Sequence, residues 1–204
     1  MCSRFWNSLV PTLYELSRFW PSHASPRERV LTYEGFKQLT PDNWLEEDPV
    51  MAMFVGVSRT GGIVKASGED RLRSLLSTQL SDSVPKDIQS IFEVARGAMA
   101  YGHFFYPLYS LGTQHLYRAL EAAITHRFRM DGGSIETRSL KGKLDWLYKH
   151  GRLGDRSEWE AIRYLRNASS HPDFQHVVPP GMVSFEFRDA AARINGLFEE
   201  EVAT

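Results

Sequence analysis

Three residues close together near the C-terminal end of a predicted helix have the chemistry needed to cleave a phosphodiester. They are Arg166, Asn167 and His171. An arginine side chain is always charged and binds phosphate oxygens through a planar fork of N–H groups. A histidine can take up and return a proton near neutral pH. An arginine and a histidine together can stabilise the charge on a phosphate ester and protonate its leaving group without a metal ion.

The position of this motif at a helix end decides whether its two charged groups can meet. On a regular helix, Arg166 and His171 lie about 140° apart around the axis and share no face. Because Pro172 disfavours the helical conformation in the residue before it, the helix is expected to end at Ser169 or Ser170. Beyond that end, the imidazole can turn toward the long arginine side chain. The negative end of the helix dipole also favours a protonated histidine at this position.

A simpler interpretation of the same residues stays open. Arg166 is then a solvated surface charge, and His171 caps the last carbonyl groups of the helix. A second Arg-x4-His match runs from Arg18 to His23 and contains Pro21. The spacing by itself is therefore not specific, as is usual for a short motif.

Two other charged residues are weaker candidates for the same site. Arg163 lies one turn before Arg166 and either adds a phosphate contact or belongs to a solvated face. Glu121 is either a further acid of the site or a surface charge, and the surface is the more usual place for a glutamate. The histidine, cysteine and carboxylate residues show no spacing typical of a metal site. The sequence therefore predicts neither a metal nor another cofactor.

Hydrophobic spacing predicts helices along most of the chain, which indicates an all-α protein. The predicted helices cover residues 10–20, 70–80, 85–100, 102–129, 140–150, 155–170 and 185–201. A loop is predicted at 177–181. In the extension that precedes residue 86, two short apolar runs at 50–57 and 63–66 flank a Gly-containing turn and suggest a β-hairpin, with a buried helix as the alternative.

Some of these helices also show which face they should bury. The motif helix is expected to begin after a cap at Asp155 or Ser157 and to turn Trp159, Ile162 and Leu165 inward. The helix at 102–129 has a predicted buried stripe made of Leu108, Leu111, His115, Leu120, Ala123 and Ile124. The last helix is expected to bury Ala191, Ile194, Leu197 and Phe198.

Composition limits the classes of function. The chain has 204 residues and a net charge of −1, so it has no overall basic signature for nucleic acid. No second basic patch stands out beside the motif. Cys2 is the single cysteine, which fits a reducing compartment. No apolar run approaches the ~18 residues of a membrane span. We therefore expect a cytoplasmic protein that does not enter the membrane.

The region from about 86 to 200 resembles the HEPN superfamily (higher eukaryotes and prokaryotes nucleotide-binding domains). The resemblance rests on the segments 106–124, 140–151 and 165–172. The first two are similar to the long first helix and to the second helix of the family. The third fits the Arg-x(4–6)-His signature, including a polar residue directly after the arginine.

The resemblance implies a fold and a function. The fold is an antiparallel helical bundle over residues 86–204, preceded by an extension at 1–85 and dimerising around the motif. Arg166 and His171 would be the catalytic pair, with Asn167 supporting them. Many members are metal-independent ribonucleases of toxin–antitoxin and antiphage defence systems. The implied partners are an RNA substrate, a second copy of the chain and an antitoxin or other defence-system protein.

Two functions from different classes follow. The first is an endoribonuclease that uses the ribose 2′-hydroxyl as its nucleophile. One chain supplies one imidazole of this kind, so a two-fold contact between chains would supply the second. The second function is a non-catalytic helical module that binds a protein or a nucleotide, because some family members only bind or scaffold. The cation and the titrating base in the motif favour the first function, and the neutral net charge favours the second.

Overall fold

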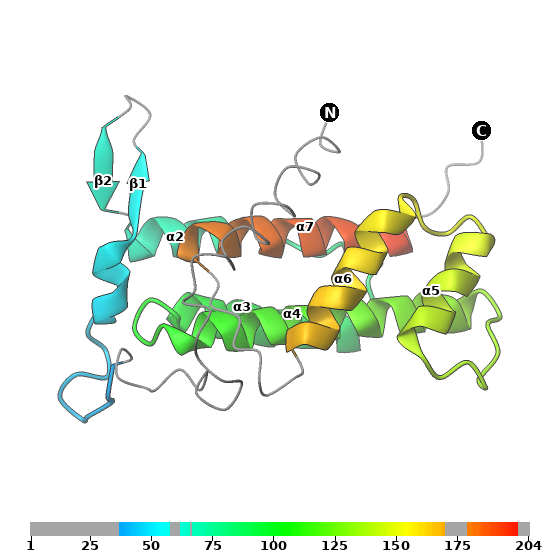
Figure 1. Cartoon of the computed structure of the whole chain (residues 1–204), viewed down its shortest axis with the longest axis horizontal. Helices are drawn as coiled ribbons and strands as arrows, with labels where there is room; N and C mark the ends of the chain where they lie inside the picture. The colour runs from blue at the N-terminus through cyan, green and yellow to red at the C-terminus, as the bar shows by residue number, and fades with distance from the viewer. Residues whose placement is uncertain (1–36, 58–61, 66, 170–178, 200–204) are drawn as a thin grey trace, which may run out of the picture. The chain divides into compact units, whose positions relative to one another are not determined.

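The computed structural model describes residues 37–57, 62–65, 67–169 and 179–199, and this part of the chain is mainly helical (Figure 1). Its elements in chain order are the 3-10 helix η2 (Pro49–Met53), strands β1 (Val55–Val57) and β2 (Ile63–Lys65), and helices α2 (Gly68–Leu76), α3 (Lys86–Tyr101), α4 (Pro107–Met130), α5 (Leu140–Lys149), α6 (Arg156–Ser169) and α7 (Pro180–Phe198). The predicted helix at 10–20 lies outside the described residues.

The two strands lie where the sequence predicts a hairpin. β1 pairs antiparallel with β2, and Val55 is opposite Lys65. The first part of the predicted run, however, is the 3-10 helix η2. Pro49 fits a first helical turn, and the Asp48 side chain caps that turn by accepting a hydrogen bond from the Val50 N–H at 3.0 Å. A proline and a side-chain cap thus override the apolar pattern in this short stretch.

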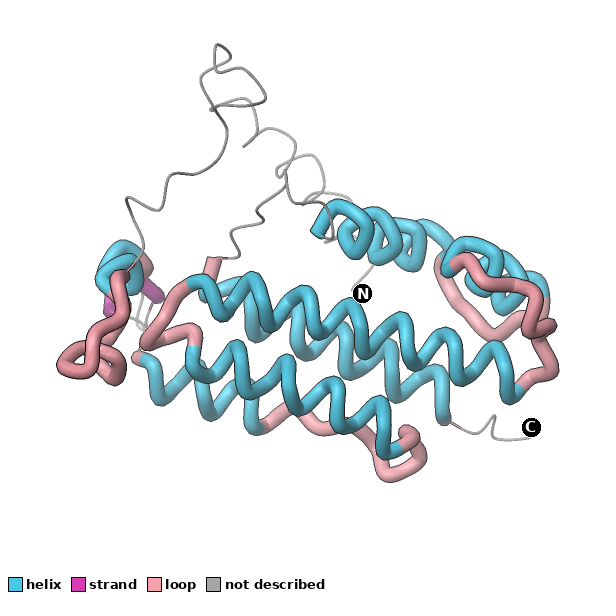
Figure 2. Tube along the Cα trace, turned by 90° about the horizontal axis from the view of Figure 1, so that it is seen from below, coloured by secondary structure: helices cyan, strands magenta, loops and turns pink. Residues whose placement is uncertain are grey.

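Three long helices form the centre of the core. α4 packs against α3 and against α7, and the three helices lie side by side in both views (Figure 1, Figure 2). Gly112 of α4 allows the close approach of α3. A Cβ atom at Gly112 would lie 2.6 Å from the Met99 side chain and 3.1 Å from the Ala95 carbonyl oxygen. The absence of a side chain at this position therefore sets how tightly the two helices pack.

Residues before α3 belong to the same core. Met51, Leu75 and Val84 are buried among the side chains of the long helices. The buried Asp48 carboxylate accepts a hydrogen bond from the Tyr106 N–H at 2.8 Å, which ties the segment before η2 to the start of α4. The core therefore continues across the expected boundary near residue 85.

The buried face of α4 differs in part from the predicted stripe. Leu120, Ala123 and Ile124 are buried as expected, but Leu111 is 44% exposed and His115 is only partly buried. The buried residues of α4 are Tyr109, Gly112, Thr113, Leu116, Tyr117, Ala119, Leu120, Ala123, Ile124 and Phe128. Because α4 packs against α3, α7, α5 and α6, its buried face is wide and includes tyrosine and threonine, which a search for aliphatic spacing does not count.

The start of α7 also differs from the prediction. This helix begins at Pro180, inside the predicted loop at 177–181, because proline fits the first turn of a helix. The four residues expected to face inward on the last helix are all buried. No helix in the described part of the chain combines the length and hydropathy of a bilayer-crossing segment.

Candidate functional site

Helix α6 carries the motif and is built as the sequence predicts. Asp155 directly precedes the helix and caps it, because its carboxylate accepts a hydrogen bond from the Ser157 N–H at 2.8 Å. Of the two expected caps, Asp155 is therefore the one used. Trp159 and Ile162 are buried, and Leu165 packs partly buried against the core. The described helix ends at Ser169, whose hydroxyl donates to the Arg166 carbonyl oxygen at 2.9 Å.

Arg166 lies in the last turn of α6 and contacts a residue 45 positions earlier in the chain. Its Nε donates to Oε2 of Glu121 at 2.9 Å, and its Nη2 lies 2.8 Å from the same oxygen. Glu121 belongs to α4, so the contact joins two helices. The arginine side chain is 36% exposed and the glutamate side chain 30% exposed. The guanidinium is thus oriented by the protein while part of its surface stays accessible to solvent.

Asn167 completes the described part of this cluster. Its Oδ1 accepts a hydrogen bond of 3.3 Å from Nη1 of Arg166. The contact is longer than a typical N–H···O bond, so it supports the guanidinium less than Glu121 does. His171 lies outside the described residues, as does the chance match from Arg18 to His23.

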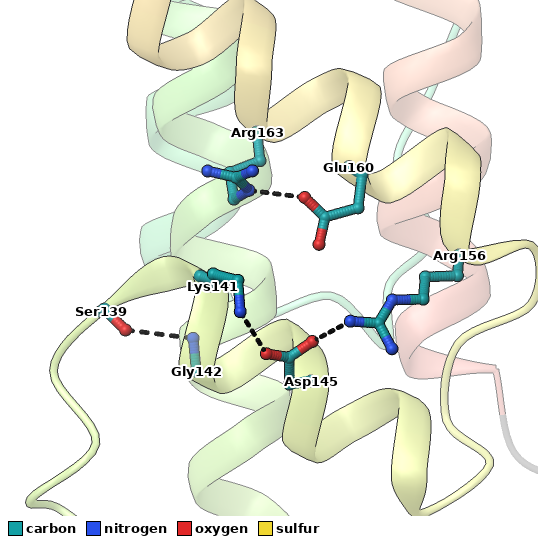
Figure 3. A network of polar contacts seen from close by, with 7 residues as sticks. All are labelled: Ser139, Lys141, Gly142, Asp145, Arg156, Glu160 and Arg163. Atoms are coloured by element: carbon teal, nitrogen blue, oxygen red, sulfur yellow. Dashed lines mark hydrogen bonds and ion pairs between the residues drawn. The ribbon is translucent and has the colours of Figure 1, made fainter.

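Arg163 has a different environment from Arg166. Its Nε donates to Oε2 of Glu160 at 2.6 Å, an ion pair within α6. Figure 3 shows this pair facing the side chains of α5. Of the predicted residues, the structure therefore brings Arg166 and Asn167 into contact and places Arg163 in a neighbouring network.

From the sequence, Glu121 is either a further acid of the site or, more commonly for a glutamate, a surface charge. The structure places it against Arg166. One signal for it is present in the sequence. Glu121 lies between small and apolar residues, with Leu120 and Ala123 buried in the core. A charged side chain at the border of a buried face commonly has a partner of opposite charge. The identity of that partner cannot be read from the local sequence.

A polar line runs along α4 from Glu121 toward a partly buried carboxyl group of α7. Thr113, Tyr117 and Glu121 follow at four-residue steps and so share one face of the helix. The Thr113 hydroxyl donates to Oε2 of Glu186 on α7 at 3.2 Å. Burial raises the pKa of Glu186 to about 7 against the opposing effect of that hydrogen bond, and Asp189 adds to the rise. Burial also raises the pKa of Tyr117. One face of α4 therefore carries the partner of Arg166 and, through Thr113, contacts a carboxyl group of α7 whose pKa is raised to about 7.

The described residues include no group of three or more histidine, cysteine and carboxylate side chains placed to hold a metal ion. The chemistry available in this part of the chain is that of an oriented cation, a hydrogen-bonding amide and nearby carboxyl groups. Searches of family models, curated proteins and solved structures found no match to this chain.

Proposed function

We propose that this protein is a metal-independent endoribonuclease that cleaves RNA through the ribose 2′-hydroxyl, with Arg166, Asn167 and His171 at its active site. The observation that carries the proposal is the contact of Arg166 with Glu121 of another helix. A guanidinium that is oriented in advance and still accessible is suited to bind a phosphate and to stabilise charge that develops on it. The setting we propose is a cytoplasmic toxin or antiphage defence system, as in the family that the sequence resembles.

In the proposed reaction, one kind of group transfers protons and another, the guanidinium of Arg166, stabilises charge. A base takes the proton of the 2′-hydroxyl, and the 2′-oxygen attacks the adjacent phosphorus. The bond from phosphorus to the 5′-oxygen then breaks, and an imidazolium donates a proton to that oxygen. Arg166 stabilises the additional negative charge on the phosphoryl oxygens. His171, which follows the negative end of α6 in the chain, is assigned the role of proton donor.

The same proposal includes the assembly. α3 to α7 would form the antiparallel bundle of the HEPN family, and two chains would meet along α6. This arrangement supplies a second His171 as the base, because each chain has one copy of the motif. Light scattering should then show a dimer at micromolar concentration. Activity in a protein that stays monomeric would contradict the shared site.

The decisive experiment removes the proposed proton donor. Purified protein is incubated with total RNA in excess EDTA, and the cut ends are analysed. We expect 2′,3′-cyclic phosphate ends, and RNA with 2′-O-methyl groups at the cut site should resist. His171→Ala should lower the rate ~10²–10⁴-fold, whereas His23→Ala at the chance match should not. If His171→Ala cuts RNA at the wild-type rate with its fold intact, the proposed nuclease mechanism is wrong.

The alternative is a non-catalytic helical dimerisation module that binds a protein or a nucleotide. One observation favours it: Arg166 is already engaged by a carboxylate, as an arginine with a purely structural role would be. On this alternative, Arg166→Ala weakens the dimer or lowers its melting temperature, and no RNA is cut by the wild-type protein. The cleavage experiment above therefore separates the two functions.

A further inference from the structure

The part of the chain that forms α5 and α6 has an excess of positive charge that the whole chain lacks. The whole chain has 24 Lys and Arg against 25 Asp and Glu. Residues 138–168 have eight cations (Arg138, Lys141, Lys143, Lys149, Arg152, Arg156, Arg163, Arg166) and four acids (Asp145, Asp155, Glu158, Glu160). The neutral total thus conceals a local basic segment, which corrects the expectation that no second basic patch exists.

Five of these charged side chains form one surface, which we call the α5–α6 outer face. Figure 3 shows Lys141 and Asp145 of α5 beside Arg156, Glu160 and Arg163 of α6. Asp145 accepts from Nζ of Lys141 at 3.1 Å and from Nη2 of Arg156 at 2.5 Å. Three cations therefore face two carboxylates, and one carboxylate holds two of the cations.

The outer face is open to solvent. The side chains of Lys141 and Arg156 are 60% and 53% exposed. The pKa of Asp145 is lowered, first by the hydrogen bond from Lys141 and then by the positive charges of Lys141, Arg156 and Arg163. All three cations thus lower the pKa of the same carboxyl group, that of Asp145. Solvent-exposed ion pairs add little to folding stability, so stability alone does not account for their convergence.

Exposed aromatic rings lie on the same two helices. The Arg156 guanidinium lies over the Tyr148 ring, 5.5 Å from its centroid. Tyr148 is 44% exposed and Tyr164 is 71% exposed. Proteins that bind single-stranded nucleic acid combine a basic track for the backbone with aromatic rings on which bases stack. The outer face has the basic track, and Tyr148 beside Arg156 adds one such ring.

The shape of the face favours contact with a backbone over a pocket for a base. The depression between the two helices is lined by Leu144, Leu153 and Trp159 together with charged residues of its rim, and it encloses about 10 Å³. That is the room of one water molecule. A ligand must therefore lie across the surface, where Arg156 is the cation at the rim of the depression.

We propose that the α5–α6 outer face binds the backbone of the RNA strand that leads away from the Arg166 site. This inference rests on the proposed function. Arg163 lies one turn before Arg166, and the ten residues from Arg156 to Arg166 span about 15 Å along α6. A few nucleotides of single-stranded RNA cover that distance. The cations would exchange part of their contact with Asp145 and Glu160 for phosphate oxygens.

The test measures binding separately from cleavage. The full chain is titrated into a labelled single-stranded oligonucleotide that is 2′-O-methylated throughout, and fluorescence anisotropy is recorded at several salt concentrations. Lys141→Ala/Arg156→Ala should bind roughly tenfold more weakly, which is the order expected for two exposed charge contacts. The slope of log affinity against log salt should fall by about 1.4, since each phosphate contact on a single strand contributes ~0.7.

Two further variants test whether RNA binding depends on the positive charges of this face or on any exposed positive charge. Arg73→Ala/Lys86→Ala also removes one arginine and one lysine from exposed positions, on α2 and α3, and should bind as the wild type does. Lys141→Arg/Arg156→Lys keeps both charges on the outer face and should retain most of the affinity. Circular dichroism melting of each variant confirms that the fold is intact.

The outcomes distinguish this inference from the proposed nuclease function. If both double-alanine variants bind RNA as tightly as the wild type does, and the wild type cuts RNA, the outer face is not an RNA contact and the nuclease proposal stands. If neither the wild type nor any variant cuts RNA, but Lys141→Ala/Arg156→Ala alone loses affinity and salt dependence, the RNA contact stands and the nuclease proposal falls. Binding of an acidic polypeptide but not of the oligonucleotide would overturn the inference.

Discussion

Arg166 and Arg156, both on helix α6, differ in how the protein holds their side chains. Arg166 is oriented by Glu121, a residue of another helix 45 positions away, and both side chains are about one-third exposed. Arg156 shares the carboxylate of Asp145 with a lysine, at a distance of 11 residues and with half of its side chain exposed. The first arrangement orients a single group, and the second gathers charge on an open surface.

This difference separates two tasks that a nucleic-acid enzyme has to perform. Stabilising a reacting phosphate requires a donor that is in place before the substrate arrives. Attracting and aligning the rest of the strand requires only positive potential, which works at longer range and depends on salt. On the proposed function, Arg166 would take part in the chemistry and the α5–α6 outer face would capture the strand. The predictions below test this division of labour, in order of decreasing effect.

The largest effect is expected at Arg166. Arg166→Ala should lower kcat for RNA cleavage by roughly 10²–10³-fold, the usual cost of removing one preorganised donor to a developing charge. Arg166→Lys should restore little, because an ammonium group cannot reproduce the planar fork. Single-turnover cleavage in EDTA measures both variants. Arg156→Ala serves as the matched control and should mainly raise KM. A kcat loss of the same size in both variants would remove the distinction between the two regions.

The next effect concerns stability and compares a partly buried carboxyl group, that of Glu186, with an exposed one. The pKa of Glu186 is raised by burial from 4.5 to about 7. A raised pKa means that the folded protein binds this proton more tightly than the unfolded chain does. The resulting stability is fully present below pH 4.5 and is lost as the pH rises through about 7. The loss should be on the order of 3 kcal/mol in the free energy of unfolding.

Glu186→Gln should remove most of this pH dependence, because the amide oxygen still accepts the Thr113 hydrogen bond but does not titrate. Urea unfolding at pH 4.5, 6 and 8 measures it. Glu69→Gln is the control, since Glu69 is 69% exposed in its ion pair with Arg73. An equal loss of stability between pH 4.5 and pH 8 in both variants would contradict the raised pKa of Glu186.

The smallest effect is expected where the positioning of Arg166 is weakened without removing the cation. Glu121→Gln should lower kcat about tenfold, because a small misplacement of a reacting group is costly. RNA affinity should stay the same or increase, since a negative charge is removed beside the phosphate site. Glu160→Gln makes the same change in the partner of Arg163 and should alter kcat by less than about twofold. Equal effects of the two substitutions would show that Glu121 has no special role.

The sequence predicted most of the framework around the site. The position of α6 and its inward residues Trp159 and Ile162 follow from local spacing, and capping chemistry left Asp155 and Ser157 as its two possible caps, of which the structure uses Asp155. The face of α4 was predicted less well, because Tyr109, Thr113 and Tyr117 are buried between two neighbouring helices. Polar and aromatic residues of this kind do not reveal their burial in an aliphatic pattern.

The sequence by itself placed the candidate residues Arg166 and Asn167 on one helix, which the structure shows as α6. Arg166 and Asn167 follow one another in the chain, so local structure places them together. Only the tertiary structure decided that Glu121 is the partner of Arg166 and that Asp145 joins Lys141 to Arg156. The physical reason is that helix periodicity governs neighbours three or four residues apart. Contacts between helices depend on how those helices pack, which no local pattern specifies.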